Sequence, residues 1–158
     1  MRNVFLAVGG YSGKLGMDSA TASGRSRATR VNALVGYGGQ RLRGGVEYFS
    51  AKNWNNPATA PGDRTSGWSL FGSYALTPQL ALFGRYDWAD PDQNSNPDLD
   101  DRYFNVGLDF QPIRNVNLAL VYKRERVEHG LVRTSNSTIG GAESGSFDEV
   151  GLWAQFRF

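Results

Sequence analysis

The chain of 158 residues contains no cysteine and one histidine, and its 17 basic and 15 acidic residues leave a formal net charge of +2. Without cysteine there is no disulfide framework, no thiol nucleophile and no thiolate metal site. The net charge is too small, and the charged residues are too scattered, to indicate a nucleic-acid-binding surface. No apolar run of 18 or more residues occurs, which excludes a transmembrane helix.

Length and composition suit one domain that covers residues 1–158. The 20 glycines and the aromatic content of 13% are more typical of curved strands than of helices. A membrane-spanning strand needs only about 9–11 residues, and every second side chain on it faces away from lipid. The missing apolar run therefore leaves open a membrane protein that is built from strands.

The last ten residues, 149–158, show the clearest strand pattern. One side carries Val150, Leu152, Ala154, Phe156 and Phe158, and the other carries Glu149, Gly151, Trp153, Gln155 and Arg157. Because successive side chains of a strand point to opposite faces, this segment has one apolar face and one largely polar face. In water such a terminal strand would promote aggregation, whereas lipid would cover its apolar face.

The same alternation predicts eight strands, at residues 2–11, 28–38, 40–51, 66–76, 79–89, 101–111, 116–127 and 147–158. In the first of them, Val4, Leu6 and Val8 compete with Phe5 and Ala7 for the apolar face. We expect an all-β fold, an antiparallel up-and-down transmembrane β-barrel with eight strands in this chain.

The expected connections alternate in length. Three are tight turns, at 38–40, 77–78 and 112–115, where glycine, proline and asparagine supply the backbone angles of a hairpin. The other four, at 12–27, 52–65, 90–100 and 128–146, are long and polar. Short periplasmic turns and long outer loops are typical of outer-membrane barrels, and an even strand count places both chain ends on the periplasmic side.

Aromatic side chains gather near both ends of the expected strands. Those near the outer ends are Tyr48, Trp68, Tyr86, Trp88, Phe104 and Tyr122, and those near the inner ends are Tyr37, Tyr74, Phe110, Phe156 and Phe158. Aromatic rings with a polar group favour membrane–water interfaces, so two girdles are predicted. Aromatic pairs inside a soluble β-sandwich are the alternative, but they account neither for the girdles nor for the alternating loop lengths.

Four segments resemble the closing strands of Gram-negative general porins: Phe83–Asp87, Tyr103–Phe110, Val116–Lys123 and Glu149–Phe158. The resemblance extends over the chain and is strongest after Trp68. It implies passive diffusion of small hydrophilic solutes or ions across the outer membrane, without a cofactor and without catalysis. Porins are usually trimers of sixteen-stranded barrels, so this chain, with half as many strands, is similar to a porin's C-terminal half.

The resemblance also implies a location and partners. We expect a Gram-negative outer-membrane protein in contact with lipid and lipopolysaccharide, a homo-oligomer, and no nucleic-acid partner. The terminal Val150, Leu152, Trp153, Phe156 and Phe158 would be the signal that the barrel-assembly machinery recognises. No signal peptide precedes Arg2, so Met1 is expected to be a start added to a mature, truncated or engineered form.

The inward positions carry nine charged residues, four basic and five acidic: Arg43, Glu47, Arg85, Asp87, Asp109, Lys123, Glu125, Glu149 and Arg157. In a wide barrel, opposed charges along the wall would select solutes by size and charge. In a closed eight-stranded barrel the interior is filled by side chains, and the same groups would pair with one another in a structural or scaffold protein. The residues alone support either arrangement.

Two further patterns are candidate sites. Residues 90–101 place oxygen ligands at alternate positions, as in a calcium loop, but Ser95 stands where glycine is needed and Asp101 where glutamate is needed. A solvated acidic loop is the expectation. His129 lies near Ser135 and Ser137, which would suit an outer-leaflet lipid-modifying enzyme, yet nothing orients the base in a flexible Gly- and Ser-rich loop. We therefore predict no catalytic and no metal-binding residue.

Overall fold

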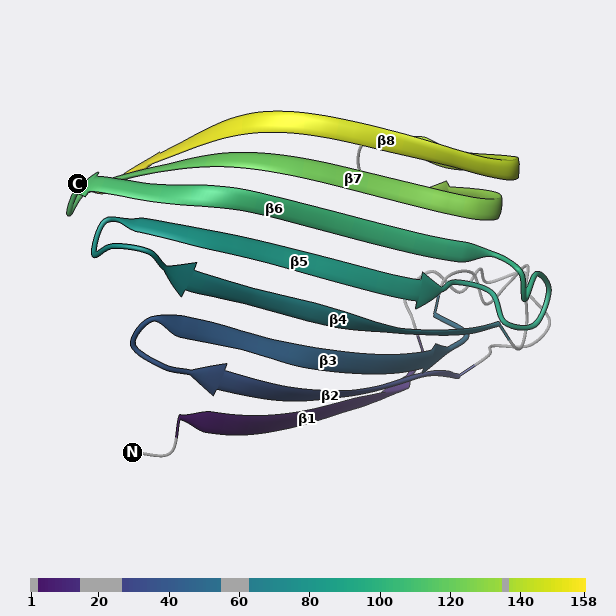
Figure 1. Ribbon diagram of the computed structural model, residues 1–158. Helices are drawn as coiled ribbons and strands as arrows, with labels where there is room; N and C mark the ends of the chain where they lie inside the picture. The colour runs from purple at the N-terminus through teal and green to yellow at the C-terminus, as the bar shows by residue number, and fades with distance from the viewer. Residues whose placement is uncertain (1–2, 15–26, 55–62, 135–136) are drawn as a thin grey trace.

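The computed structural model describes residues 3–14, 27–54, 63–134 and 137–158. Its strands form a single antiparallel sheet in which each strand pairs with its neighbours in sequence (Figure 1). In order they are β1 (Val4–Gly13), β2 (Ala28–Gly38), β3 (Leu42–Lys52), β4 (Arg64–Ala75), β5 (Leu80–Asp90), β6 (Asp100–Ile113), β7 (Val116–Arg133) and β8 (Thr138–Phe156). The described residues include no helix with the length and hydropathy needed to cross a bilayer.

The sheet is open. Within the described residues β1 pairs only with β2 and β8 only with β7, and these two strands lie at opposite margins of the sheet (Figure 1). The all-β up-and-down topology and the strand count are confirmed, whereas closure of these eight strands into a barrel is not found. Alternation determines which face a residue occupies, but it carries no information about how strongly the sheet curves.

The two ends of the sheet differ as predicted. The β2–β3, β4–β5 and β6–β7 connections are short and lie at the end where β1 begins and β8 ends (Figure 1). In the β4–β5 turn, for example, the Thr77 hydroxyl accepts hydrogen bonds from the backbone N–H groups of Gln79 and Leu80, at 3.2 and 3.0 Å. β1, β3 and β5 finish at the other end, where longer segments of sequence separate them from β2, β4 and β6.

The prediction of a long loop at residues 128–146 is wrong. Instead, β7 and β8 continue as a paired hairpin to Arg133 and Thr138. A bulge separates the pairs formed by Glu128 and Gly130, where His129 has a φ of 58°. Gly140, with a φ of 124°, packs so closely on the Gly130 carbonyl that a Cβ there would lie 1.9 Å from its oxygen. Glycines in this segment therefore bend a hairpin rather than forming a loop.

The register resolves the face of β1. Val4, Leu6 and Val8 pair with Tyr37, Val35 and Ala33 of β2, on the face that carries the apolar side chains of the other strands. Phe5 and Ala7 lie on the opposite face. The alternation that was ambiguous within residues 2–11 is thus settled by the neighbouring strand.

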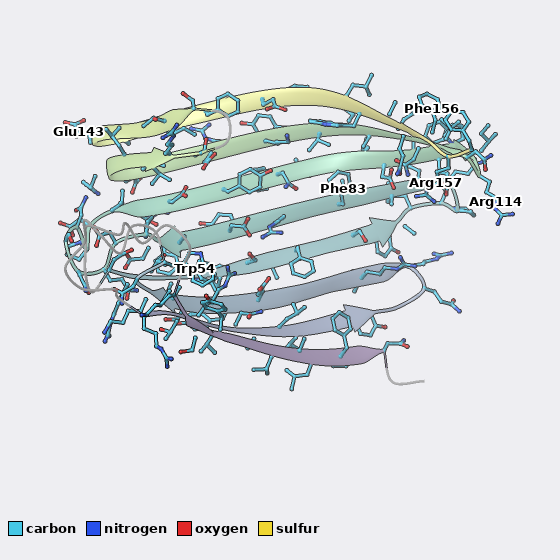
Figure 2. All side chains as sticks on the ribbon, turned by 180° about the vertical axis from the view of Figure 1, so that it is seen from behind. Trp54, Phe83, Arg114, Glu143, Phe156 and Arg157 are labelled. Atoms are coloured by element: carbon cyan, nitrogen blue, oxygen red, sulfur yellow. The ribbon has the colours of Figure 1, made fainter. Side chains whose placement is uncertain are left out.

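Among the described residues buried apolar side chains are few, and apart from Val121 they lie at the long-loop end. Leu99, Val127 and Ile139 form a cluster with Val132 and Phe147 packed against it. Val127 and Phe147 belong to the polar face of β7 and β8, whereas Val132 and Ile139 belong to the end of their hairpin. Glu143 marks the extreme long-loop end of the sheet (Figure 2). Beyond the bulge the hairpin therefore folds back over the polar face.

Candidate functional site

All nine predicted inward charges lie on one face of the sheet, which we call the polar face. Eight of them occupy alternate positions of β3, β5, β6, β7 and β8. Arg157 follows β8 directly, and its backbone N–H donates to the Asn115 carbonyl at 3.0 Å. Arg157 and Arg114 lie at the short-turn end (Figure 2).

Six of the nine charges lie on two neighbouring rows of the polar face. Glu47, Asp87 and Glu125 are connected by register through Ser69 and Tyr103, which places three carboxylates on one row across β3 to β7. The next row toward the short turns holds Arg85, Lys123 and Glu149. The rows are two residues apart along each strand, about 7 Å. Opposite charges thus face each other along the strand direction.

Arg85 connects the two rows on β5. Its Nε lies 2.8 and 2.7 Å from the two carboxylate oxygens of Asp87, and its Nη2 donates to the Ser69 hydroxyl at 3.1 Å. The Ser69 hydroxyl in turn donates to Asp87 at 2.5 Å. The Arg85 side chain remains 47% exposed, so this ion pair is hydrated. Such a group orders the surface while leaving its charge accessible to solutes.

Lys123 forms the second cluster, on β7. Its Nζ lies 3.1 Å from Glu149 on β8 and 4.4 Å from the centre of the Trp153 ring. The ammonium group therefore has a carboxylate and an aromatic face as partners. Of the predicted assembly-signal residues, Trp153 lies on the polar face, whereas Val150, Leu152 and Phe156 are exposed on the apolar face.

A third cluster on the polar face was not predicted as part of the site. The Arg30 guanidinium lies 5.3 Å from the Phe49 ring centre and 5.6 Å from that of Trp54, and the Trp54 ring meets Tyr11 edge-on at 5.4 Å. The sequence could have placed Arg30 on the polar face, because Val31 and Ala33 point to the apolar face and Arg30 alternates with them. Trp54 follows β3 in a segment expected to be a loop, where alternation does not apply.

The opposite face, which we call the apolar face, carries on β2 to β7 nine of the eleven predicted girdle residues: Tyr37, Tyr48, Trp68, Tyr74, Tyr86, Trp88, Phe104, Phe110 and Tyr122. It also exposes large aliphatic side chains in nearly every strand, among them Val8 at 72% and Leu152 at 75%. This face is continuous from β1 to β8.

The aromatic residues nearest the short turns form a regular staircase on the even-numbered strands. Tyr37 of β2 lies level with Gly72 of β4, so Tyr74 is displaced by two residues. Tyr74 is level with Leu108, two residues before Phe110 of β6. Phe110 is level with Ala154, two residues before Phe156 of β8. The displacement is thus two residues for every two strands.

The aromatic residues nearest the long loops repeat this staircase. Tyr48, Tyr86 and Tyr122 on β3, β5 and β7 step by two residues each, as do Trp68 and Phe104 on β4 and β6. A residue spans about 3.3 Å along a strand, and neighbouring strands lie about 4.8 Å apart. A shift of two residues over two strands therefore means that the strands are tilted by roughly 35° from the normal to the two rows of aromatic rings. Neither slope was visible in the sequence, because it depends on the register.

The acidic segment between β5 and β6 is largely exposed and is attached to the sheet at its end. Leu99 is buried, and the Asp92 carboxylate accepts from the backbone N–H of Ser95 at 2.9 Å. Beyond the outer aromatic step at Phe104, burial and the charge of Glu125 raise the pKa of Asp101 to about 6. Where the structure describes the chain, no three acidic or histidine side chains form a metal-binding group.

His129 lies in β7, not in a flexible loop as expected. Its backbone carbonyl accepts from Asn96 Nδ2 at 2.6 Å, and its Nδ1 lies 3.1 Å from the Asp98 carbonyl oxygen. Ser137 forms the hairpin turn, where its N–H donates to the Thr134 hydroxyl at 3.2 Å. Ser135 lies outside the described residues. The contacts of His129 anchor the hairpin to the β5–β6 connection.

Comparison of the chain with protein-family models, with curated proteins and with solved structures gives no match.

Proposed function

We propose that this sheet is part of the wall of an outer-membrane β-barrel through which small hydrophilic solutes or ions diffuse passively. The observation that carries the proposal is the pair of aromatic staircases. Strands of transmembrane barrels are tilted by about 35–45°, and aromatic girdles lie at both interfaces. Rings on such tilted strands share one depth only if they shift along the register from strand to strand, as they do here.

The apolar face supports a hydrocarbon environment. Monomeric soluble proteins seldom expose continuous apolar patches beyond a few hundred Å². Here Val8, Val35, Leu70, Leu120 and Leu152 are all more than half exposed, on five different strands. Between the staircases this face carries no charged side chain. Lipid would cover these side chains on every strand, whereas water would drive such sheets to aggregate.

The polar face supports a hydrated lumen. Its two charged rows are partly exposed, and the ion pairs of Arg85 with Asp87 and of Lys123 with Glu149 keep side chains of both signs at the surface. A groove of about 500 Å³ runs beside Arg43 and Arg85 and is lined by Phe5, Phe71 and Phe83. Charges of both signs along a wide channel would sort solutes by size and charge without a tight binding site.

This environment also implies partners. Barrels of this kind occur in outer membranes, so lipid and lipopolysaccharide would contact the apolar face, and the barrel-assembly machinery would insert the chain. The polar face, by contrast, would meet only water and solutes. No cofactor and no catalytic step belong to the proposed function.

Ion conductance of the refolded chain tests the proposal. The chain is folded in detergent, added to a planar bilayer, and its reversal potential is measured in a salt gradient. We expect discrete conductance steps, and we expect Asp87→Asn to shift the ion selectivity toward anions. Ser146→Asn, on the opposite face near the loop end, is the matched control and should leave the selectivity unchanged. Silent bilayers with inserted protein would contradict passive diffusion.

A further inference from the structure

Both margins of the sheet have the composition of strands that are paired. β1 contains no charged residue and no proline, and β8 from Ser144 onward contains no lysine, arginine or proline. Soluble proteins protect exposed edge strands with lysines, prolines, bulges or short length. In this chain the bulge lies at the loop end of the β7–β8 hairpin, away from the rest of the β8 edge.

The bulky side chains at the two margins lean inward, away from the edges. The Phe5 ring of β1 covers Gly36 of β2, where a Cβ would lie 2.1 Å from the ring. On β8, Trp153 stacks against Lys123 of β7. Within the described residues, the outer hydrogen-bonding groups of β1 and β8 pair with no other strand.

In a bilayer these edges require partners. Open sheet edges do not occur in the hydrocarbon region, because their unpaired backbone N–H and C=O groups would find no hydrogen-bond partner there. β1 and β8 run in opposite directions, so an antiparallel seam between them continues the up-and-down pattern. It also continues both faces, since each strand alternates between apolar and polar side chains.

The folded-back hairpin argues against a seam within one chain. An eight-stranded barrel has an interior just wide enough for side chains. The polar face already carries Phe71, Phe83 and Trp153, and in addition Val132 and Ile139 of the hairpin pack over its loop end. A cavity of about 610 Å³ separates Leu131, Val132 and Arg133 from Phe49 and Trp54. Closing these eight strands into one barrel would therefore eliminate this cavity and displace the hairpin from the polar face.

We propose that two copies of the chain pair edge to edge, β1 of each with β8 of the other, and that the two eight-stranded sheets close a sixteen-stranded barrel. The inference rests on the proposed function, and it names the partner that completes the lumen. A two-fold axis along the barrel makes the two seams identical and leaves no free edge. Two-fold symmetry is also the most common symmetry of homo-oligomers. The hairpins then lie inside a wide lumen.

Disulfide trapping tests the seam, and because the chain has no cysteine, every introduced thiol is unique. One chain carries Leu6→Cys, on the apolar face of β1. A second carries Val150→Cys, Leu152→Cys or Ala154→Cys, on the apolar face of β8, so that the three positions cover alternative registers. The chains are mixed, folded into lipid vesicles and oxidised. Gln155→Cys, on the polar face of β8, is the matched control.

We expect a disulfide-linked dimer with at least one apolar-face position of β8 and none with the control, because two thiols bond only when their Cα atoms lie within about 7 Å on the same face. A chain with both cysteines should also give dimers. An internal disulfide at monomer mass would overturn the proposal in favour of eight-stranded closure. Inserted chains that form neither product would overturn it as well, since other strands would then cover the edges.

Vesicle flotation separates these outcomes from a failure of the proposed function. If the chain floats with the vesicles and conducts but gives no intermolecular disulfide, the two-copy barrel is wrong and the passive diffusion stands. If the chain does not float with lipid, the membrane assignment itself fails.

Discussion

Arginine in place of Leu120 would test which face of β7 meets lipid. Leu120 is 51% exposed on the apolar face and pairs with Leu108 and Leu152. It lies two residues from Tyr122, between the two aromatic staircases. At the bilayer midplane, a lipid-facing arginine destabilises a transmembrane barrel by about 2–4 kcal/mol. The ratio of folded to unfolded protein should therefore fall by about 30-fold to 900-fold.

Two matched variants test whether the destabilisation by arginine depends on the face of the sheet and on the depth in the bilayer. Ala119→Arg lies one residue away on the polar face, where its register partner is Asp109, and we expect a change below about 1 kcal/mol because the guanidinium gains a hydrated carboxylate partner. Leu82→Arg is on the apolar face but level with Tyr74, at the inner aromatic step. Near an interface the cost of arginine falls to about 0–1 kcal/mol.

Denaturant titration of the chain refolded in lipid vesicles measures these differences. Tryptophan fluorescence follows unfolding, and linear extrapolation gives the free energy of unfolding in the absence of denaturant. The expected order of destabilisation is Leu120→Arg first, with Leu82→Arg and Ala119→Arg well below it. Equal losses at residues 119 and 120 would refute the assignment of the two faces.

Two further variants probe the loop end of the sheet. Gly140→Ala should destabilise the folded-back hairpin by about 1–3 kcal/mol, because alanine is strained at positive φ and its Cβ meets the Gly130 carbonyl; faster proteolysis of the hairpin would show it, and unchanged cleavage would contradict the bend. Asp101→Asn should stabilise the protein at about pH 8 but not at about pH 4: burial raises the folded-state pKa of Asp101 to about 6, so its carboxylate disfavours folding as pH rises past that value. Free energies of unfolding at both pH values check this, and an equal effect at both would contradict it.

The strands and their faces were predictable because period-two alternation survives in nearly every segment. Turn residues such as Thr77 and Pro78 also marked the short connections correctly. The faces of β1 alone could not be assigned from its own sequence, since Phe5 and Leu6 are equally apolar and only the pairing with β2 distinguishes them.

The errors lie where alternation stops. At His129 the β7–β8 register shifts by one residue, because Ala142 and Glu143 of β8 lie opposite this single residue of β7. The hairpin beyond the bulge therefore no longer continues the pattern of the strands before it. Its glycines and serines then resemble a loop, although Val132 and Ile139 were a signal of packing. Curvature of the sheet and the slope of the aromatic staircases depend on pairing across strands, which a single sequence does not specify.

The most direct test of the account is whether the chain folds without lipid. Circular dichroism and sedimentation should be compared for the chain in plain buffer and in detergent or lipid vesicles. The account predicts β-structure with protease resistance only in detergent or vesicles, and aggregation in buffer, because the apolar face needs hydrocarbon. A folded, monomeric and protease-resistant chain in buffer alone would contradict it.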